Sequence, residues 1–336
     1  MNLQQYLLRR LMLIIPTFLG ITLITFIVIQ LSPGNPAAMK LRMGEQGMMG
    51  DEVTREIVEQ TKKLYGLDKP IWIRYAIWLK RVVTLDFGDS YKDHRPVIEK
   101  IGERLPVTIE LNLISIFLVY LIAIPVGVFS AVKQGTLQDK SMTAVLFILY
   151  SLPNFWVAVL LIMFLGGGDF LDWFPIYGIT SPGMESSALL TRLVDHLWHL
   201  VLPVFCLTYG GLAGLSRFMR AGMLEEIRQD YIRTARAKGL PEKLVIFKHA
   251  MRNSIIPIIT LMGYLLPGML GGSIIIESIF SIPGMGQLSF EAVLSRDYPV
   301  VMAIATISAL LTLLGILISD LLYVWADPRI TYEAES

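Results

Sequence analysis

Few residues of this 336-residue chain combine the types and spacing that chemistry needs. His196 and His199 lie three residues apart and could ligate a metal ion, but no carboxylate cluster accompanies them in the sequence. We therefore interpret them as residues at the head of a helix and predict no metal site. A G-x-x-x-x-G-K-[ST] phosphate-binding loop is absent, as are H-E-x-x-H, C-x-x-C and G-x-S-x-G. The sequence therefore predicts no catalytic residue, no cofactor bound by this chain and no ATPase activity of its own.

The composition is that of a membrane protein. Hydrophobic residues make up 54% of the chain and charged residues only 17%, against roughly 25% charged residues in soluble domains. The mean hydropathy is +0.58. The net charge of +1 gives no indication of nucleic-acid binding, and the single cysteine, Cys206, cannot form an intrachain disulfide. We therefore predict an all-α integral membrane protein surrounded by lipid.

Six apolar runs of about 20 residues are long enough to cross a hydrocarbon core of roughly 30 Å as helices. His196, His199 and Pro203 interrupt the start of the fourth run. We expect six transmembrane helices, near residues 11–31, 107–130, 142–165, 198–216, 254–277 and 300–322.

Carboxylates occur near the ends of three of these runs, at Glu110, Glu277 and Asp320. A carboxylate at mid-membrane depth would indicate a proton relay or an ion site. Near an interface, snorkelling or a contact at a helix end is the commoner explanation. The sequence therefore gives no basis for predicting a proton pathway.

The distribution of Lys and Arg predicts the orientation in the membrane. Arg9 and Arg10 precede the first run, whereas the loop at 217–252 holds nine basic residues and the loop at 166–197 holds one, Arg192. We therefore expect both termini and the 217–252 loop in the cytoplasm. A cleaved leader is the alternative for the N-terminus, but its apolar region would span only about 7–15 residues. An uncleaved first span fits the longer run better.

The segment between the first two runs is expected to form an external helical cap. Residues 51–64 and 71–83 each have an amphipathic pattern, and the second carries Trp72 and Trp78, which suit a helix at the membrane surface. We expect four parts: 1–31, the cytoplasmic N-terminal end and first helix; 32–106, the cap; 107–326, a five-helix core with the loop 217–253; and 327–336, a cytoplasmic tail.

A basic helix-turn-helix pattern occupies the 217–253 loop. Asp230 lies near the start of DYIRTARAKG, where the helix dipole favours a negative charge. Gly239 is placed to be the C′ residue of that helix, and Pro241 to be N1 of a second helix. Thr234, Ala235 and Ala237 are expected to keep part of the surface small. Such a helix, with a small face and a basic rim, can dock on another protein; a solvated loop that follows the positive-inside rule is the alternative.

Polar residues of the spans are candidates for a translocation path. Asn154, Tyr209 and Tyr264 could line such a path or could make structural hydrogen bonds, and the sequence does not distinguish these two roles. Pro203, Pro257 and Pro267 are expected to bend the fourth and fifth spans. Bent, glycine-rich spans suit a bundle that changes shape, although tight helix packing explains the same residues.

Several stretches together resemble ABC importer permeases of the branch that imports dipeptides, oligopeptides and nickel. Thr234 to Gly239, followed by a basic helix to Pro257, resembles the EAA loop of that superfamily, with Arg233 and Thr234 in place of its first Glu-Ala. Similar stretches run along almost the whole chain: RRLMLIIPT to SPGNP (9–36), DFGDSYKDHRPVIEKIGERLPVTIEL (86–111), YSLPNFW (150–156), FSIPGMGQL (280–288) and DPRI (327–330).

This resemblance implies a function and a set of partners. It implies the type I ABC importer permease fold, and a cell (inner) membrane location. The implied partners are a second homologous permease, two ATPase subunits that bind ATP and Mg²⁺, and an external solute-binding protein. The implied coupling residues are Arg233, Thr234, Ala235, Arg236, Ala237, Lys238 and Gly239.

The expected substrate is a dipeptide or oligopeptide, with nickel or another small chelate as the alternative. A channel is a remote alternative, because no span shows a polar stripe along one face. An intramembrane enzyme would need paired catalytic groups at membrane depth, and the sequence shows none. If the coupling role is correct, Gly239→Pro or a bulky residue at Ala235 should uncouple transport without preventing insertion.

Overall fold

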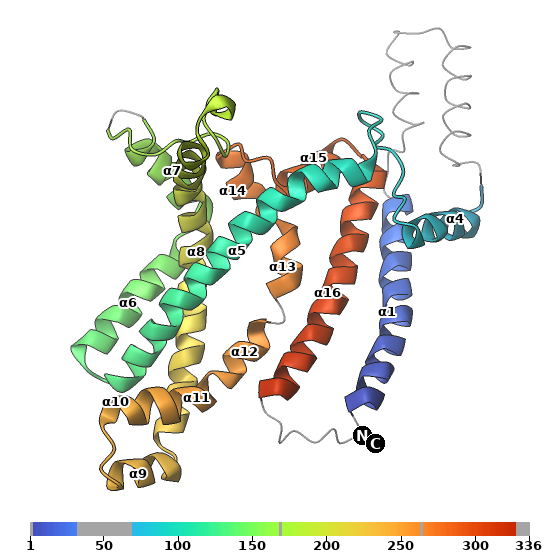
Figure 1. Cartoon of the computed structure of the whole chain (residues 1–336). Helices are drawn as coiled ribbons and strands as arrows, with labels where there is room; N and C mark the ends of the chain where they lie inside the picture. Colours follow the sequence, from blue (N-terminus) through green and yellow to red (C-terminus); the bar gives the residue numbers. More distant parts are fainter. Residues whose placement is uncertain (1–2, 32–68, 168–169, 263–264, 327–336) are drawn as a thin grey trace, which may run out of the picture. The chain divides into compact units, whose positions relative to one another are not determined.

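The computed structural model describes residues 3–31, 69–167, 170–262 and 265–326. These residues are almost entirely helical (Figure 1). The helices are α1 (Leu3–Leu31), α4 (Ile71–Val83), α5 (Val97–Val132), α6 (Leu137–Ser151), α7 (Asn154–Leu165), η2 (Met184–Ser186), α8 (Leu189–Ile227), α9 (Asp230–Ala237), α10 (Glu242–Leu244), η3 (Val245–Ala250), α11 (Met251–Ser254), α12 (Ile256–Met262), α13 (Leu265–Gly271), α14 (Ile274–Ile279), α15 (Met285–Leu294) and α16 (Tyr298–Ala326).

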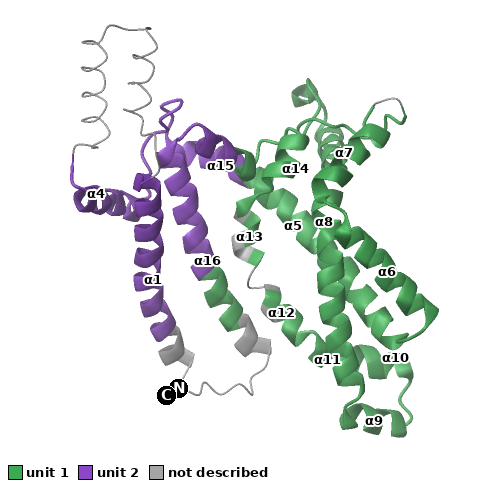
Figure 2. Ribbon diagram, turned by 180° about the vertical axis from the view of Figure 1, so that it is seen from behind, with its two compact units in different colours: residues 1, 106–287, 314–336 green, residues 2–105, 288–313 purple. Residues whose placement is uncertain are grey.

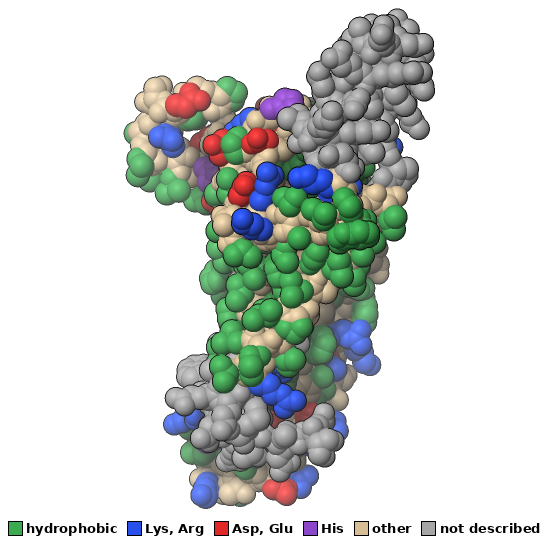
Figure 3. Space-filling view, turned by 90° about the vertical axis from the view of Figure 1, so that its right-hand side faces the viewer, with side chains coloured by type: hydrophobic (Ala, Val, Ile, Leu, Met, Phe, Trp, Pro, Cys, Tyr) green, Lys and Arg blue, Asp and Glu red, His purple; other side chains and the backbone are tan. Residues whose placement is uncertain are grey.

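Four described helices are long and apolar enough to cross a membrane: Leu8–Leu31, Val97–Val132, Leu189–Ile227 and Tyr298–Leu321. A fifth crossing is possible if α6 and α7 count as one span, although these two helices meet at 93°. The all-α membrane class is therefore confirmed, with four or five candidate spans in the described part of the chain. Apolar side chains cover much of the face drawn in Figure 3.

The third predicted span, 142–165, was wrong as a single helix. The break falls at Leu152, whose backbone is extended (ψ 124°), and at Pro153, which caps α7. The residue before a proline is pushed out of the helical region by the proline ring, so Leu152 ends α6.

The fifth predicted span, 254–277, is divided among α12, α13 and α14. None of these three pieces exceeds seven residues. Pro257 and Pro267 each lack a backbone N–H, and Gly271–Gly272 precedes α14, where Gly272 has a φ of +60°. The sequence anticipated a bend here but not a series of short helices.

The chain divides into two compact units, coloured in Figure 2. Unit 1 comprises residues 1, 106–287 and 314–336, and unit 2 comprises 2–105 and 288–313.

In unit 2, α4 packs against α1 through aromatic side chains. The Phe26 ring centroid lies 5.4 Å from that of Tyr75 and 6.0 Å from that of Trp78. The Tyr75 and Thr22 hydroxyls are 3.0 Å apart. Trp72, one turn before Tyr75, is 71% exposed. The predicted amphipathic helix at 71–83 is therefore a helix, whereas 32–68, including the predicted helix at 51–64, lies outside the described residues.

A buried carboxylate connects distant parts of unit 2. Asp297 accepts hydrogen bonds from the Ser90 hydroxyl and, at 2.8 Å, from the Tyr91 backbone N–H. Asp93 accepts a 2.7 Å bond from Lys100. Burial opposes ionisation of Asp93, but the hydrogen bonds from Lys100 and Ser90 outweigh it and lower the pKa of Asp93 to about 2. These contacts fix the turn before α5, where the cap was predicted to lead into the second span.

Unit 1 contains two apolar clusters. The first lies where α5, α8, α9, η3 and α12 meet; its buried members are Ala123, Val128, Ala131, Leu215, Met219, Met223, Ile232, Ala235, Val245, Ile246, Ala250 and Ile258. The second joins α5, α7, α8 and α14; its buried members are Leu111, Ala158, Leu200, Leu202, Val204, Cys206, Ile276, Phe280 and Ile282. The long helix α8 contributes to both clusters and links them.

Candidate functional site

The helix α9 is attached to the end of α8 by two side chains. Ile232 is fully buried and Ala235 is 7% exposed, and both belong to the apolar cluster that includes Met219 and Met223 of α8. Positions 232 and 235 are three residues apart and therefore share one face of the helix. The opposite face of α9 is left exposed at the end of unit 1 (Figure 1).

Gly239 ends α9 in the way the sequence predicted. Its φ is +76°, a conformation that side chains with a Cβ rarely adopt. The Gly239 N–H donates to the Arg236 carbonyl at 2.9 Å, and the Leu240 N–H donates to the Ala235 carbonyl at 3.4 Å. These two bonds are those of a Schellman motif, and Leu240 packs against the cluster that contains Ala235. Gly239 therefore turns the chain back toward its anchor.

Pro241 occupies the N-cap of α10, one position earlier than predicted. Its ψ of 140° is extended rather than helical, and its carbonyl accepts from the Leu244 N–H at 2.8 Å. An ion pair spans the turn: the Arg236 guanidinium donates to both Glu242 carboxylate oxygens, at 2.7 and 3.2 Å. The hydrogen bond from Arg236 is the main reason that the pKa of Glu242 lies below its usual value.

The predicted coupling residues do not all lie on one surface. Arg233, Thr234, Arg236, Ala237, Lys238 and Gly239 are exposed. Ala235 is buried, so the expectation that it contributes to a small exposed face was wrong. The exposed small side chains are Thr234 and Ala237. A bulky residue at Ala235 would displace the anchor of α9, because overpacking a filled core forces its neighbours to move.

Two further aromatic residues, Tyr231 in α9 and Phe247 in η3, were not predicted. The Tyr231 hydroxyl donates to the Glu226 carboxylate, and the Asn253 amide donates to the Tyr231 oxygen at 3.0 Å. Burial, helped by the Glu226 bond, raises the pKa of Tyr231 to about 12, so the hydroxyl keeps its proton at neutral pH. On the other side of the turn, Phe247 is 60% exposed. The sequence signal that could have singled out Phe247 is the presence of an aromatic residue within a basic run.

The three candidates for the translocation path have different environments. The Tyr209 hydroxyl donates to the Leu152 carbonyl at 2.8 Å and the side chain is 3% exposed, so Tyr209 makes a structural hydrogen bond at the α6–α7 bend. Asn154 is half-buried at the first position of α7. Tyr264 lies outside the described residues. These positions do not assemble a polar path in the described part of the chain.

A buried carboxylate organises the turn that leads into α15. Glu277, 2% exposed, accepts hydrogen bonds from the Gln287 N–H at 2.8 Å, the Ser273 N–H at 3.2 Å and the Thr108 hydroxyl at 3.3 Å. The Thr108 oxygen in turn accepts from the Met285 N–H at 2.7 Å. We call these five residues the Glu277 hub. It joins two of the stretches on which the family resemblance rests, 86–111 and 280–288.

Glycines make room for the Glu277 carboxylate. A Cβ at Gly284 would lie 2.4 Å from the Glu277 carboxyl carbon, and a Cβ at Gly286 would lie 2.7 Å from the Ile274 backbone nitrogen. Both distances are too short for real atoms, so these positions require glycine. The sequence flagged Glu277 as a contact at a helix end but gave no signal that its partners come from α5, the N-cap of α14 and the first turn of α15.

The histidines lie where α8 begins and make hydrogen bonds to protein groups. The His196 ring contacts the Ile179 carbonyl at 2.9 Å and the Glu110 carboxylate at 2.8 Å. His199 contacts the Asp195 carbonyl at 2.8 Å. Among the described residues, no group of three or more His, Cys, Asp or Glu side chains could hold a metal ion.

Comparison with known families identifies the chain. Residues 123–332 match the family model of the binding-protein-dependent transport system inner membrane component. Residues 3–112 match the N-terminal model of membrane components of the same transport systems. The two models together cover almost the whole sequence.

Curated relatives agree with both matches. The oligopeptide transport system permease protein AppB of Bacillus subtilis is 41% identical over 97% of this chain and 99% of its own length. The dipeptide transport system permease protein DppB of Escherichia coli K12 is 36% identical over 98% and 99%, respectively. The peptidoglycan transport system permease protein YejB of Agrobacterium fabrum is 34% identical over 98% of each chain.

Among solved structures, an amino acid ABC transporter crystallised with histidines is a distant match. It has a TM-score of 0.45 and 15% identity, over 67% of this chain and 94% of that one. The family assignment depends on the sequence matches alone. By those matches, the chain belongs to the binding-protein-dependent transport family and is a multi-pass inner-membrane ABC importer permease of its peptide-transport branch, not an ATPase.

Proposed function

We propose that this permease and a second, homologous permease together form the translocation path for dipeptides or oligopeptides. An external solute-binding protein delivers the substrate. Two ATPase subunits, which bind the ATP and Mg²⁺, supply the energy. The names of the relatives, which include oligopeptide and dipeptide permeases, support the peptide substrate.

In this proposal α9 is the element that receives the movement of an ATPase subunit. The observation that carries it is the division of α9 into two faces. Ile232 and Ala235 attach it to the cluster at the end of α8. Arg233, Ala237 and Lys238 stay exposed on a small, basic surface. A helix that is anchored on one side and free on the other can transmit a push from a partner into the bundle, as rigid-body switching requires.

The proposed orientation puts α9, both termini and the 217–253 loop in the cytoplasm. The nine basic residues of that loop support it, because short cytoplasmic loops are enriched in Lys and Arg. We also propose that the broken segment from α12 to α14 acts as a further crossing, which would bring the total to six spans. Non-helical backbone is tolerated at membrane depth where it is enclosed by protein.

The decisive experiment is purification of the tagged permease with its bound partners, followed by transport in vesicles. We expect recovery of a second permease and two ATPases, and ATP-dependent uptake of labelled dipeptide or oligopeptide. Uptake of nickel without uptake of peptide would show that the substrate is nickel and not a peptide. Recovery of the chain alone as a homo-oligomer with passive flux would contradict the importer assignment and favour a channel.

The role of α9 is tested by Ala237→Trp. Because Ala237 is exposed, the bulky ring should block docking without disturbing the Ile232 anchor, and transport should fall at least tenfold while the permease still inserts. Ala188→Trp is the matched control, because Ala188 is also exposed but caps the N-terminal end of α8, whereas α9 follows its C-terminal end. Normal transport by Ala237→Trp would show that α9 is not the docking surface.

A further inference from the structure

A hollow between α5, α6 and α8 is not used by the proposed coupling mechanism. It is a partly open crevice whose empty space, including space open to the surroundings, is about 300 Å³, while the room in it for a water-sized molecule is about 20 Å³. All of its lining residues belong to unit 1. Its lining residues are Val126 and Ser130 of α5, Thr143, Leu146 and Phe147 of α6, and Ala213, Ser216, Arg217 and Arg220 of α8.

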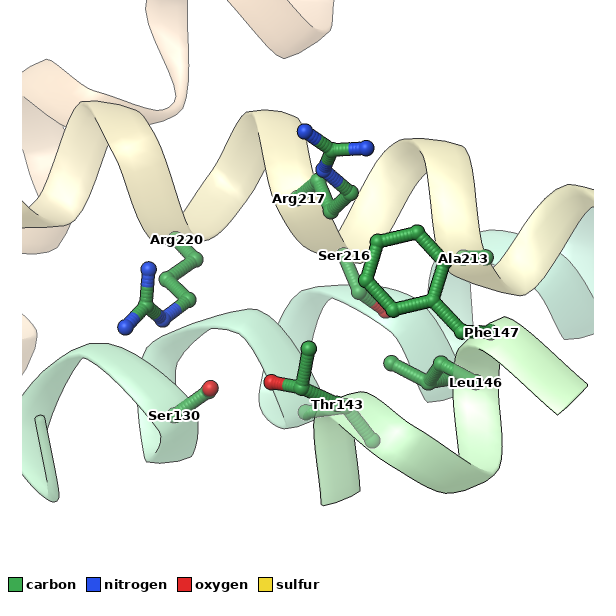
Figure 4. Close-up of a pocket in the computed structure, with 9 residues that line it drawn as sticks. Ser130, Thr143, Leu146, Phe147, Ala213, Ser216, Arg217 and Arg220 are labelled. Atoms are coloured by element: carbon green, nitrogen blue, oxygen red, sulfur yellow. The ribbon is translucent and has the colours of Figure 1, made fainter. Parts of the chain in front are cut away.

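The lining changes from polar to apolar along the hollow (Figure 4). Ser130 and Arg220 lie at one end, next to the loop that joins α5 to α6. Leu146, Phe147 and Ala213 lie at the other end. Ser130 is about 3 Å along the axis from the end of α5, whereas Val126 is about 9 Å from it. The polar end is therefore at the loop and the apolar end is deeper among the spans.

Two hydroxyls in the middle of the hollow have no hydrogen-bond partner among the described residues. Ser216 is 3% exposed, lines the hollow, and its Oγ has no hydrogen-bond partner among the described residues. Thr143 also lines the hollow, and its hydroxyl makes no hydrogen bond within the described part of the chain. A buried polar group without a partner costs free energy, which a ligand that accepts a hydrogen bond would recover.

The two arginines of the hollow differ in their availability. Arg220 is already neutralised: it donates to Asp139 at 2.9 and 3.2 Å, and Asp139 also accepts from Ser130. Arg217 lies over the Phe147 ring, 5.3 Å from its centroid, and no described carboxylate pairs with it. Ring stacking leaves the guanidinium N–H groups at the edge free to donate. The hollow therefore carries one uncompensated positive charge.

We infer that this hollow binds an anionic phospholipid from the leaflet on the side of the 217–253 loop. The lipid phosphate would accept from Arg217, Ser216 and Thr143. The start of an acyl chain would lie over Leu146 and Phe147. A free anion would match the charge but not the apolar end, and an apolar ligand would leave the Ser216 hydroxyl unpaired. A phospholipid satisfies both the charge and the apolar end of the hollow.

The test is native mass spectrometry of the purified importer complex with dioleoylphosphatidylglycerol, and separately with the zwitterionic dioleoylphosphatidylcholine. We expect preferential retention of phosphatidylglycerol. Arg217→Gln should weaken that retention about tenfold, because a charge-assisted hydrogen bond is lost. Arg228→Gln is the matched control: it removes a positive charge at the end of the same helix but outside the hollow, and retention should not change.

Ser216→Ala keeps the inference testable if Arg217→Gln fails to fold. It removes the unpaired hydroxyl and nearly preserves volume, so the lipid-free complex should be as stable as the wild type while phosphatidylglycerol retention falls.

Four results would overturn the inference. They are equal retention of both lipids, equal loss in Arg228→Gln, displacement of the lipid by inorganic phosphate at the same concentration, and cross-linking of Leu146→Cys to the second permease through a thiol-attached photoreactive group. The last two would assign the hollow to a free anion and to a protein partner, respectively.

Discussion

The α9 segment and the Glu277 hub, both in unit 1, depend on different main interactions. α9 is attached mainly by two buried apolar side chains, Ile232 and Ala235, with one further hydrogen bond from the Tyr231 hydroxyl to Glu226 of α8. In the hub, a buried carboxylate accepts hydrogen bonds from Ser273, Gln287 and Thr108.

This difference separates two structural tasks. Apolar contacts are weakly directional, so α9 can move slightly against the apolar cluster that contains Ile232 and Ala235 and still present its exposed face to a partner. Hydrogen bonds in a buried site are directional and costly to break, so the hub fixes the turn into α15 in one conformation. We expect perturbation of the hub to affect overall stability, and perturbation of α9 to act locally.

The largest effect is expected for Glu277→Ala. The substitution leaves the Ser273 and Gln287 N–H groups and the Thr108 hydroxyl without their acceptor, at a cost of about 3–5 kcal/mol. The Tm of the purified permease in detergent should fall accordingly. The Tm of Glu277→Gln should fall less, because glutamine keeps one oxygen acceptor. Glu185→Ala is the control, since Glu185 is exposed in η2. An equal Tm for both alanine variants would show that the hub does not stabilise the turn.

Ile232→Ala should have the next largest effect. Removing this fully buried side chain leaves a cavity under α9, with an expected cost of about 2–4 kcal/mol. Because the loss is confined to the seat of α9, hydrogen exchange should accelerate across 230–239 and remain unchanged in 273–287. Accelerated exchange in both segments would mean that the two regions unfold together, contrary to the comparison.

Gly239→Val should cost about 1–2 kcal/mol, because a β-branched residue is strained at a φ of +76°. Gly239→Asn should cost less, since Asn tolerates this conformation better. No atom lies within 4 Å of an added Cβ at this position, so backbone strain is the only expected source of the loss. The Tm values of the two variants measure it. Equal values would point instead to a general intolerance of side chains there.

The smallest effect is expected for Glu242→Gln, which removes a partly exposed ion pair worth about 0.2–1 kcal/mol. The hydrogen bond from Arg236 lowers the pKa of Glu242, so the pair stabilises the fold above the usual carboxyl pKa of 4.5. This contribution is lost as the pH falls through the lowered pKa. The Tm difference between wild type and Glu242→Gln should therefore be present at neutral pH and disappear in acid. A difference that persists in acid would exclude the ion pair as its source.

Local rules predicted part of this structure from the sequence. The helix at 71–83 followed from its amphipathic pattern, and the end of α9 followed from Gly239, because a C′ position favours the residue that tolerates positive φ. These features depend on neighbouring residues only. The membrane class followed from composition, and the absence of ATPase residues agreed with the permease family.

Features that depend on distant contacts were not predicted. The burial of Ala235 depends on residues of α8 and η3, and an alanine in a basic run gives no signal of its environment. The Glu277 hub joins Thr108 to residues more than 160 positions away. The sharp bend at Leu152 and Pro153 and the division of 254–277 were also missed, because hydropathy measures apolar length and not straightness.

The continuity of α8 has a mechanical consequence. This single helix of 39 residues is about 58 Å long. Near one end it carries the seat of α9, and along its length it reaches Tyr209, which holds the Leu152 carbonyl at the bend between α6 and α7. A rod of this kind transmits displacement without needing a relay of side chains. Pro203, inside α8, lacks the N–H that would continue the helical hydrogen bonds. It lies farther from α9 along the helix than Tyr209 does. A displacement applied at α9 therefore reaches the α6–α7 bend before it reaches Pro203, where α8 can flex.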